Sequence, residues 1–221
     1  MNRPTPLSFL LVLFTLTGSA GLAGVSQTSR VLGSIDIAAG EHSGDVSTVN
    51  GSIHIGASAV VGAAHTVNGG IEVDDHATAT ELKTVNGSIE LSDSVRVSGD
   101  VHTINGKLKL ENGVDVAGEL KNVNGGMRIA AAHVAGGIRS TTGNIELGPN
   151  ARIEGGIHME KESGRSQSDS VPRIVVGPGS VVSGTLLFER PVKLYVSDSA
   201  TIGAVQGATA IKFSGDHPPR D

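Results

Sequence analysis

The residues of this chain that could perform chemistry are its eight histidines and its acidic side chains, because the chain has no cysteine. Without cysteine there is no disulfide, no thiolate zinc site and no thiol nucleophile. Only His65 and His102 fall in the same row of the repeat described below, two periods apart. Twice the strand spacing separates them by roughly 9.5 Å, too far for one zinc ion. The histidine pattern therefore predicts surface positions and no metal site.

The densest acidic cluster is Asp74-Asp75-His76, which could in principle bind calcium or supply a general acid and base. The equivalent positions in neighbouring copies are Gly56-Ala57 and Ser92-Asp93, so stacking builds no shared carboxylate cage. Serine-hydrolase, zinc-protease, phosphate-loop and calcium-nonapeptide motifs are all absent from the sequence. We expect no enzymatic activity and no cofactor.

Charged residues recur at two fixed positions of the repeat. The cationic row is His65, Lys83, His102, Lys121 and Arg139, and the acidic row two residues earlier is Asp45, Glu81, Asp100 and Glu119. One interpretation is a binding stripe for an anionic polymer. The other, which we favour, is a solvated face with cross-strand pairs, because the mixed signs cancel any long-range field. Only 2% of residues are aromatic and the pI is about 5.9, so nucleic-acid binding is not expected.

These side chains must be positioned by a short repeat, which returns roughly every 18 residues along most of the chain. The motif Thr-Val-Asn-Gly begins at Thr48, returns at Thr66 and Thr84, and continues in degenerate form. Each period holds three short stretches in which apolar and polar residues alternate, separated by Ser, Asp and Gly, and no helical spacing follows residues 1–24. Three strands and three corners form one turn of a three-sided solenoid. The sequence therefore predicts an all-β parallel β-helix of about ten turns, a rod of ~45 Å.

The apolar residues of successive copies form columns that face the interior. The first column runs through Ile35, Ile53, Ile71, Ile89, Leu108, Met127 and Ile145, and continues with Val175, Leu194 and Ile211 as the starts of the last turns. A tube this narrow has room for aliphatic side chains and not for rings, which accounts for the low aromatic content beside 38% hydrophobic residues. The repeat itself leaves the handedness open.

The Asn-Gly pairs mark one corner of every turn. Stacked asparagines predict an amide ladder, and glycine there permits the positive φ that a tight corner needs. The predicted corner residues are Asn50, Gly51, Asn68, Gly69, Asn86, Gly87, Asn105, Gly106, Asn124 and Gly125.

The ends of the chain differ from the repeat. Residues 1–24 read as a cleaved secretory signal peptide, with Arg3, an apolar core of about ten residues and small residues before the cleavage site. Residues 25–215 form a single solenoid domain with a polar loop at 160–172. The proline-containing residues 216–221 form a flexible tail that could cap one end, as residues 25–34 could cap the other.

Segments such as TVNGSIEL, GDVHTING and IVVGPGSVVSGTL resemble the bactofilin family of polymer-forming proteins, and also the Asn-Gly-rich solenoid repeats of bacterial adhesin-type proteins. The resemblance covers roughly residues 30–215. It implies a right-handed coil, no catalysis and self-assembly by end-to-end stacking, with Phe213 as an apolar assembly contact in the last turn. Bactofilins typically lack an export signal, whereas this chain begins with one.

We therefore expect an exported, non-enzymatic structural or interaction protein, periplasmic or secreted, that self-assembles or binds an envelope or surface polymer. After cleavage of the signal no transmembrane anchor is expected. The alternative is a carbohydrate-binding or polysaccharide-active β-helix protein, which would need a groove with clustered carboxylates or stacked aromatics. A third class is the left-handed hexapeptide acyltransferase, whose coil has the same period.

Overall fold

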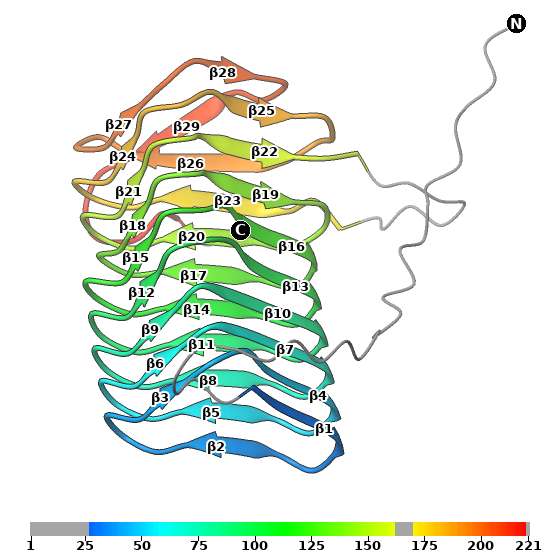
Figure 1. Cartoon of the computed structure of the whole chain (residues 1–221). Helices are drawn as coiled ribbons and strands as arrows, with labels where there is room; N and C mark the ends of the chain where they lie inside the picture. The colour runs from blue at the N-terminus through cyan, green and yellow to red at the C-terminus, as the bar shows by residue number, and fades with distance from the viewer. Residues whose placement is uncertain (1–26, 162–169, 220–221) are drawn as a thin grey trace, which may run out of the picture.

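The computed structural model describes residues 27–161 and 170–219. The predicted signal peptide, residues 1–24, lies outside the described residues. Every described element is a strand, and the strands form three parallel sheets, as the repeat predicted. One strand from each of the three sheets together make up one turn, and each strand pairs with the corresponding strand of the next turn (Figure 1). The protein is thus an all-β, three-sided β-solenoid of about ten turns.

Sheet A contains ten strands. In order they are β1 (Thr28–Leu32), β4 (Val46–Asn50), β7 (Ala63–Asn68), β10 (Glu81–Asn86), β13 (Val101–Asn105), β16 (Leu120–Asn124), β19 (Ile138–Ser140), β22 (Ile157–Met159), β25 (Leu186–Phe188) and β28 (Val205–Gln206).

Sheet B also contains ten strands. They are β2 (Ile35–Ile37), β5 (Ile53–Ile55), β8 (Ile71–Val73), β11 (Ile89–Leu91), β14 (Leu108–Leu110), β17 (Met127–Ile129), β20 (Ile145–Leu147), β23 (Arg173–Val176), β26 (Lys193–Ser197) and β29 (Ala210–Phe213).

Sheet C contains nine strands of two residues each. They are β3 (His42–Ser43), β6 (Val60–Val61), β9 (Thr78–Ala79), β12 (Arg96–Val97), β15 (Asp115–Val116), β18 (His133–Val134), β21 (Arg152–Ile153), β24 (Val181–Val182) and β27 (Thr201–Ile202). Because these strands are so short, most of this side of the solenoid consists of corner residues, and sheet C is narrower than sheets A and B.

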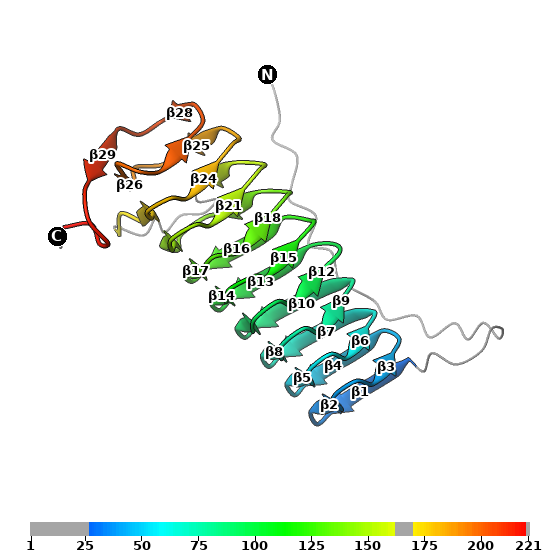
Figure 2. The same cartoon turned by 90° about the vertical axis from the view of Figure 1, so that its left-hand side faces the viewer.

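The coil is right-handed. In Figure 1 the strands of sheet A run to the right and those of sheet B to the left, while the chain rises from β1 to β29. Figure 2 places sheet B behind sheet A in that view, which fixes the hand. A right-handed parallel crossover is also the rule for twisted strands. The handedness differs from the left-handed coil of the hexapeptide acyltransferases.

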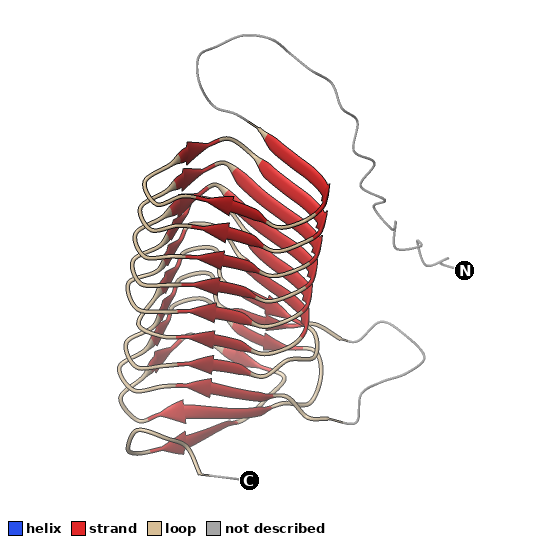
Figure 3. Ribbon diagram, turned by 90° about the horizontal axis from the view of Figure 1, so that it is seen from below, coloured by secondary structure: helices blue, strands red, loops and turns tan. Residues whose placement is uncertain are grey.

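The interior of the coil, here called the bore, is filled by aliphatic side chains in columns. Ile53, Ile55, Leu82 and Leu120 have no accessible surface, and one continuous apolar cluster extends from the first turn to β26. Figure 3 shows the stacked turns around this core. Outward residues alternate with these inward ones, so the sheets present polar rows to solvent.

Two of the predicted turn starts are wrong by one residue. Ile145 pairs with Ile174, and Leu194 pairs with Ala210, so Val175 and Ile211 face outward. The error arose because the outward row of sheet B becomes apolar in the last turns, where the alternation that marks the inward face disappears. Val175, Tyr195 and Phe213 form a second, smaller cluster on the outside of sheet B.

The loop expected at 160–172 falls between β22 and β23, and residues 162–169 lie outside the described residues. The step along the chain from Ile145 to its partner Ile174 is more than half as long again as the preceding step, from Met127 to Ile145. The loop therefore replaces one Asn-type corner, between sheets A and B, without interrupting the ladder.

Residues 216–219, the described part of the tail expected at 216–221, do not cap the solenoid. Arg173, on β23, donates from Nη2 to the carbonyl oxygen of Pro219 at 2.7 Å. The tail therefore folds back along the outer face of sheet B (Figures 1 and 2). Residues Thr28–Leu32, expected as part of a cap, are the first strand of sheet A, paired with β4.

Candidate interaction surface

The predicted amide ladder is present along the corner between sheets A and B. The Nδ2 of each asparagine donates to the Oδ1 of the asparagine one turn earlier, at 2.9 Å in every step from Asn50 to Asn124. Thr142 continues the ladder by donating from Oγ1 to Asn124 Oδ1. All five asparagines are exposed, so the ladder is a solvent-facing edge of the rod.

The reason predicted for the corner glycines is wrong for four of the five. Gly51, Gly69, Gly87 and Gly106 lie outside the left-handed region, and only Gly125 has a positive φ, 132°. A Cβ on any of them would overlap the carbonyl group of the corner glycine one turn earlier. Glycine is required because the turns approach closely at this corner.

Sequence reasoning missed the role of the threonine two residues before each of the first four ladder asparagines. The Oγ1 of Thr66 donates to Gly51 O, and the Oγ1 of Thr84 donates to Gly69 O, both at 2.8 Å. These threonines are buried on the bore side. The signal was in the repeat, since a polar residue recurs there at an inward position where aliphatic residues would be expected.

The charged rows on the outer face of sheet A form a chain of ion pairs. Glu81 contacts both Lys83 (2.5 Å) and His65 (3.1 Å). Two turns further, Glu119 contacts Lys121 (2.8 Å) and Arg139 (3.3 Å). Each of these two glutamates lies between basic side chains of its own turn and an adjacent turn. The geometry agrees with a mutually neutralised face and not with a cationic binding stripe.

The same contacts shift the pKa values of the row. Burial raises the pKa of Glu81, but hydrogen bonds from Lys83 and His65 outweigh it and hold this pKa below its ordinary value. A backbone hydrogen bond from Glu119 and an ion pair with Lys121 lower the pKa of Asp100. These carboxylates are thus held in the charged form.

His102 differs from its neighbours in the cationic row. It is aligned between Lys83 and Lys121. Burial and the two ammonium groups lower its pKa below the ordinary value. The row therefore contains a neutral imidazole between two cations.

His133, on sheet C, shows the opposite effect. Its Nδ1 lies 2.6 Å from Asp115 and its Nε2 3.1 Å from Glu154. The hydrogen bond with Asp115, reinforced by Glu154, raises its pKa. Each ring nitrogen thus faces a carboxylate, which favours the imidazolium form.

The Asp74-Asp75-His76 cluster is a structural corner. Asp74 Oδ2 lies 3.1 Å from His54 Nε2, and Asp75 Oδ1 accepts the backbone N–H of Asp93. His76 takes up a left-handed conformation, with φ of 61°. The three side chains therefore serve the stacking of adjacent turns, and among the described residues no group of three potential ligands is placed to hold a metal ion.

A groove interrupts the outer face of sheet A in its later turns. The acidic row ends at Glu119, and glycines Gly137 and Gly156 take the corresponding positions before β19 and β22, with φ of 97° and 89°. The glycines that line the groove are Gly136 and Gly155, where a Cβ would overlap the backbone of the preceding turn, so this part of the groove floor carries no side chain. The groove has a volume of about 390 Å³, and its polar lining is Glu119, Arg139, His158, Thr185 and Gln206.

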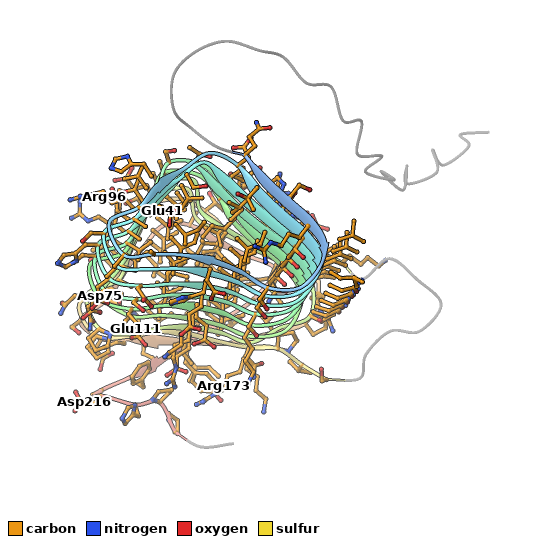
Figure 4. The ribbon with its side chains drawn as sticks, turned by 60° about the horizontal axis from the view of Figure 1, so that its bottom comes forward. Glu41, Asp75, Arg96, Glu111, Arg173 and Asp216 are labelled. Carbon is orange, nitrogen blue, oxygen red and sulfur yellow. The ribbon has the colours of Figure 1, made fainter. Side chains whose placement is uncertain are left out.

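The return of the tail along sheet B encloses a second cleft, of about 370 Å³. The ionisable side chains of its lining are Arg173, Glu146, Asp216 and His217. Figure 4 shows Arg173 and Asp216 near the C-terminal segment, whereas Arg96 projects from another side of the coil. The guanidinium of Arg173 stacks over Tyr195, 4.7 Å from the ring centroid.

Phe213, the predicted assembly contact, lies beside this cleft. It is 6% exposed and packs against Val175 and Tyr195 of its own chain. In this conformation its ring is covered and presents no apolar surface to a second molecule.

Comparison with family models, with curated proteins and with solved structures finds no match to the chain. The likeness to bactofilins therefore rests on the repeat pattern and the parallel β-solenoid alone. Within residues 27–161 and 170–219 no helix is long and apolar enough to cross a membrane.

Proposed function

We propose that the protein is an exported, non-enzymatic scaffold that presents the sides of a rigid rod to a component of the cell envelope or surface. The observation that carries the proposal is the unbroken ladder of parallel strands from β1 to β29 around one apolar bore. In such a ladder each turn holds the next in register. Side chains on the outer faces are therefore fixed relative to one another over the length of the rod.

The signal-like residues 1–24 support an exported location, and the side faces support lateral binding. Sheet A carries aligned charged rows, and the Asn ladder forms a regular polar edge beside them. Hydrogen-bonding groups repeated once per turn suit a partner that extends along the rod.

Export and binding are tested together with a chain tagged after Asp221. We expect mass spectrometry to show the loss of residues 1–24, together with recovery from the periplasmic or secreted fraction and crosslinking to an envelope component. A variant lacking residues 1–24 serves as the control and should remain inside the cell. Retention of the intact chain in the cytoplasm would refute export, and crosslinks to itself alone would refute lateral partner binding.

A second candidate function, carbohydrate binding, is favoured by the groove on sheet A. Its bare glycine floor allows close approach to a ligand, and Arg139, His158, Thr185 and Gln206 offer hydrogen bonds to hydroxyl groups. The groove has no aromatic lining, so binding would depend on these polar contacts.

This candidate is tested by retention on insoluble cell-wall polysaccharide from the exporting cell. We expect His158→Ala with Gln206→Ala to weaken retention about tenfold, the effect of one or two lost hydrogen bonds. The control is His133→Ala, which lies on sheet C. Equal retention of the double groove variant and the His133→Ala control would exclude the groove as the binding site. Release of reducing sugar by the wild type would indicate an enzyme.

A further inference from the structure

The first and last turns depart from the repeat at positions that face the bore. In sheet A, Arg30 of β1 is aligned with Thr48, and that column contains neutral residues from Thr48 to Phe188. In sheet B, Lys212 of β29 is aligned with Val196, in the column of Ile37 and Ile55. Each end of the rod thus carries a cation where the interior turns carry a neutral side chain.

The edges of the terminal turns are otherwise suited to stacking. β1 has no strand of the described chain beyond it, and its Val31 and Leu32 are 70% and 75% exposed. Open edges with apolar side chains favour pairing with another chain, and inward-pointing charges are a known means of preventing it.

Head-to-tail stacking would bring β1 of one copy onto β28 of the next and β2 onto β29. Arg30 would then enter the column that contains Phe188, and Lys212 would lie against Ile37. Among the described residues no buried side chain is acidic, so neither cation would find a carboxylate in the bore. Burying an unpaired charge is strongly unfavourable. Head-to-head contact would bring two Arg30 side chains together.

The segment before β1 cannot neutralise Arg30 either, because residues 1–26 contain no Asp or Glu. The Nη1 of Arg30 donates to the carbonyl oxygen of Ser34 at 3.1 Å, and the side chain remains exposed. Its charge is therefore available to repel a stacked copy.

We infer that Arg30 and Lys212 are specificity-determining residues that exclude a second copy of this chain from both ends of the solenoid, so that the protein acts as a rod of fixed length. The inference rests on the proposed scaffold function, whose lateral binding leaves the ends free. It separates this chain from the polymer-forming proteins that its repeats resemble.

The test replaces both cations with residues found in their own columns, Arg30→Thr with Lys212→Val. We expect the wild type to sediment as one species at all concentrations and to appear as short rods by electron microscopy. The double variant is expected to form filaments, and each single variant to stay short because one mismatched end remains in every junction. The matched control is Arg96→Thr with Lys109→Val, two cations that face outward and should leave the rod unassembled.

Filaments of the wild type would overturn the inference, and so would a double variant with a wild-type circular dichroism spectrum that stays as short as the wild type. Should the double variant misfold, sedimentation of the wild type still tests whether the native ends associate. Short wild-type rods that capture no envelope component would refute the proposed function and leave the inference standing.

Discussion

Single side chains hold adjacent turns together at the narrow corner of this solenoid. Each inward threonine donates a hydrogen bond to the carbonyl oxygen of a corner glycine one turn earlier. That glycine has no side chain that could cover its own carbonyl. The asparagine amides join the same turns on the outside. The three residues of the repeated motif therefore stabilise the same contact between adjacent turns: Thr on the bore side, Asn on the solvent side, and Gly by allowing the two backbones to approach.

Replacing Thr84 with Val should destabilise the protein by about 1 kcal/mol, because the part-buried carbonyl of Gly69 loses its donor while the shape of the side chain is kept. Urea denaturation followed by circular dichroism measures the change. Thr84→Ser retains the hydroxyl and should cost less. Unchanged stability of Thr84→Val would contradict a contribution from the hydrogen bond, and an equal loss in both variants would mean that the methyl group contributes as much as the hydrogen bond.

His102 should titrate below the ordinary histidine pKa of about 6.5 in an NMR titration of the imidazole. The folded state disfavours the protonated form, so the unfolded chain binds more protons between the two pKa values. The stability associated with this residue is therefore present above about pH 6.5 and is lost as the pH falls toward the folded pKa.

Lys83→Met removes a neighbouring cation and should raise the pKa of His102. Lys109→Met, on sheet B, is the control and should leave it unchanged. A pKa of His102 that does not respond to Lys83→Met would show that Lys83 does not contribute and that burial and Lys121 cause the shift.

At the scale of elements, the repeat predicted the columns, the three sheets and the Asn ladder, because each depends on a spacing that the sequence displays directly. It failed where the outer row of sheet B becomes apolar at Val175 and Tyr195, since alternation then no longer separates inside from outside. The sequence could not predict the close approach of the corner glycines. A glycine repeated once per turn is expected both where φ is positive and where the backbones of successive turns touch, so the repeat does not distinguish the two causes. The groove on sheet A depends on the same kind of backbone contact, at Gly136 and Gly155.

A recurring left-handed position lies at another corner, between sheets B and C. Ser58, Ser94 and Asn150 occupy this conformation with φ near 60°, as Gly113 does with φ of 70°. A non-glycine residue there costs roughly 1–2 kcal/mol.

Ser94→Gly should therefore stabilise the protein by about 1 kcal/mol, and Gly113→Ala should destabilise it by a similar amount. Thermal unfolding of the two variants measures both effects. Ser98→Gly serves as the control, because Ser98 is not among the residues with positive φ, and it should not stabilise. A loss of stability in Ser94→Gly would show that the serine side chain contributes more than the strain.

At the scale of the whole molecule, the solenoid is a sum of similar turns, each in contact mainly with its two neighbours. The loop between β22 and β23 shows that a corner can be extended while the pairing of Ile145 with Ile174 is kept. Length is therefore adjustable only in whole turns.

Deleting residues 69–86, one period, should give a folded rod shorter by about 4.8 Å, because Asn68 then joins Gly87 in the same register. Small-angle scattering and circular dichroism measure length and fold. Deleting residues 78–86 removes about half a turn and should prevent folding, since inward residues would be rotated out of the bore. Equal folding of both deletions would contradict the view that whole turns are the unit of stability.

The direction of the inter-turn hydrogen bonds has a mechanical consequence. These bonds lie along the axis of the rod, so tension applied between its two ends loads the turns in series and opens them one at a time. Each opened turn releases roughly 60 Å of extended chain, from about 18 residues at ~3.4 Å each. A force applied across the rod is instead shared by many turns at once. A rod of this kind would extend stepwise under axial tension while resisting lateral stress.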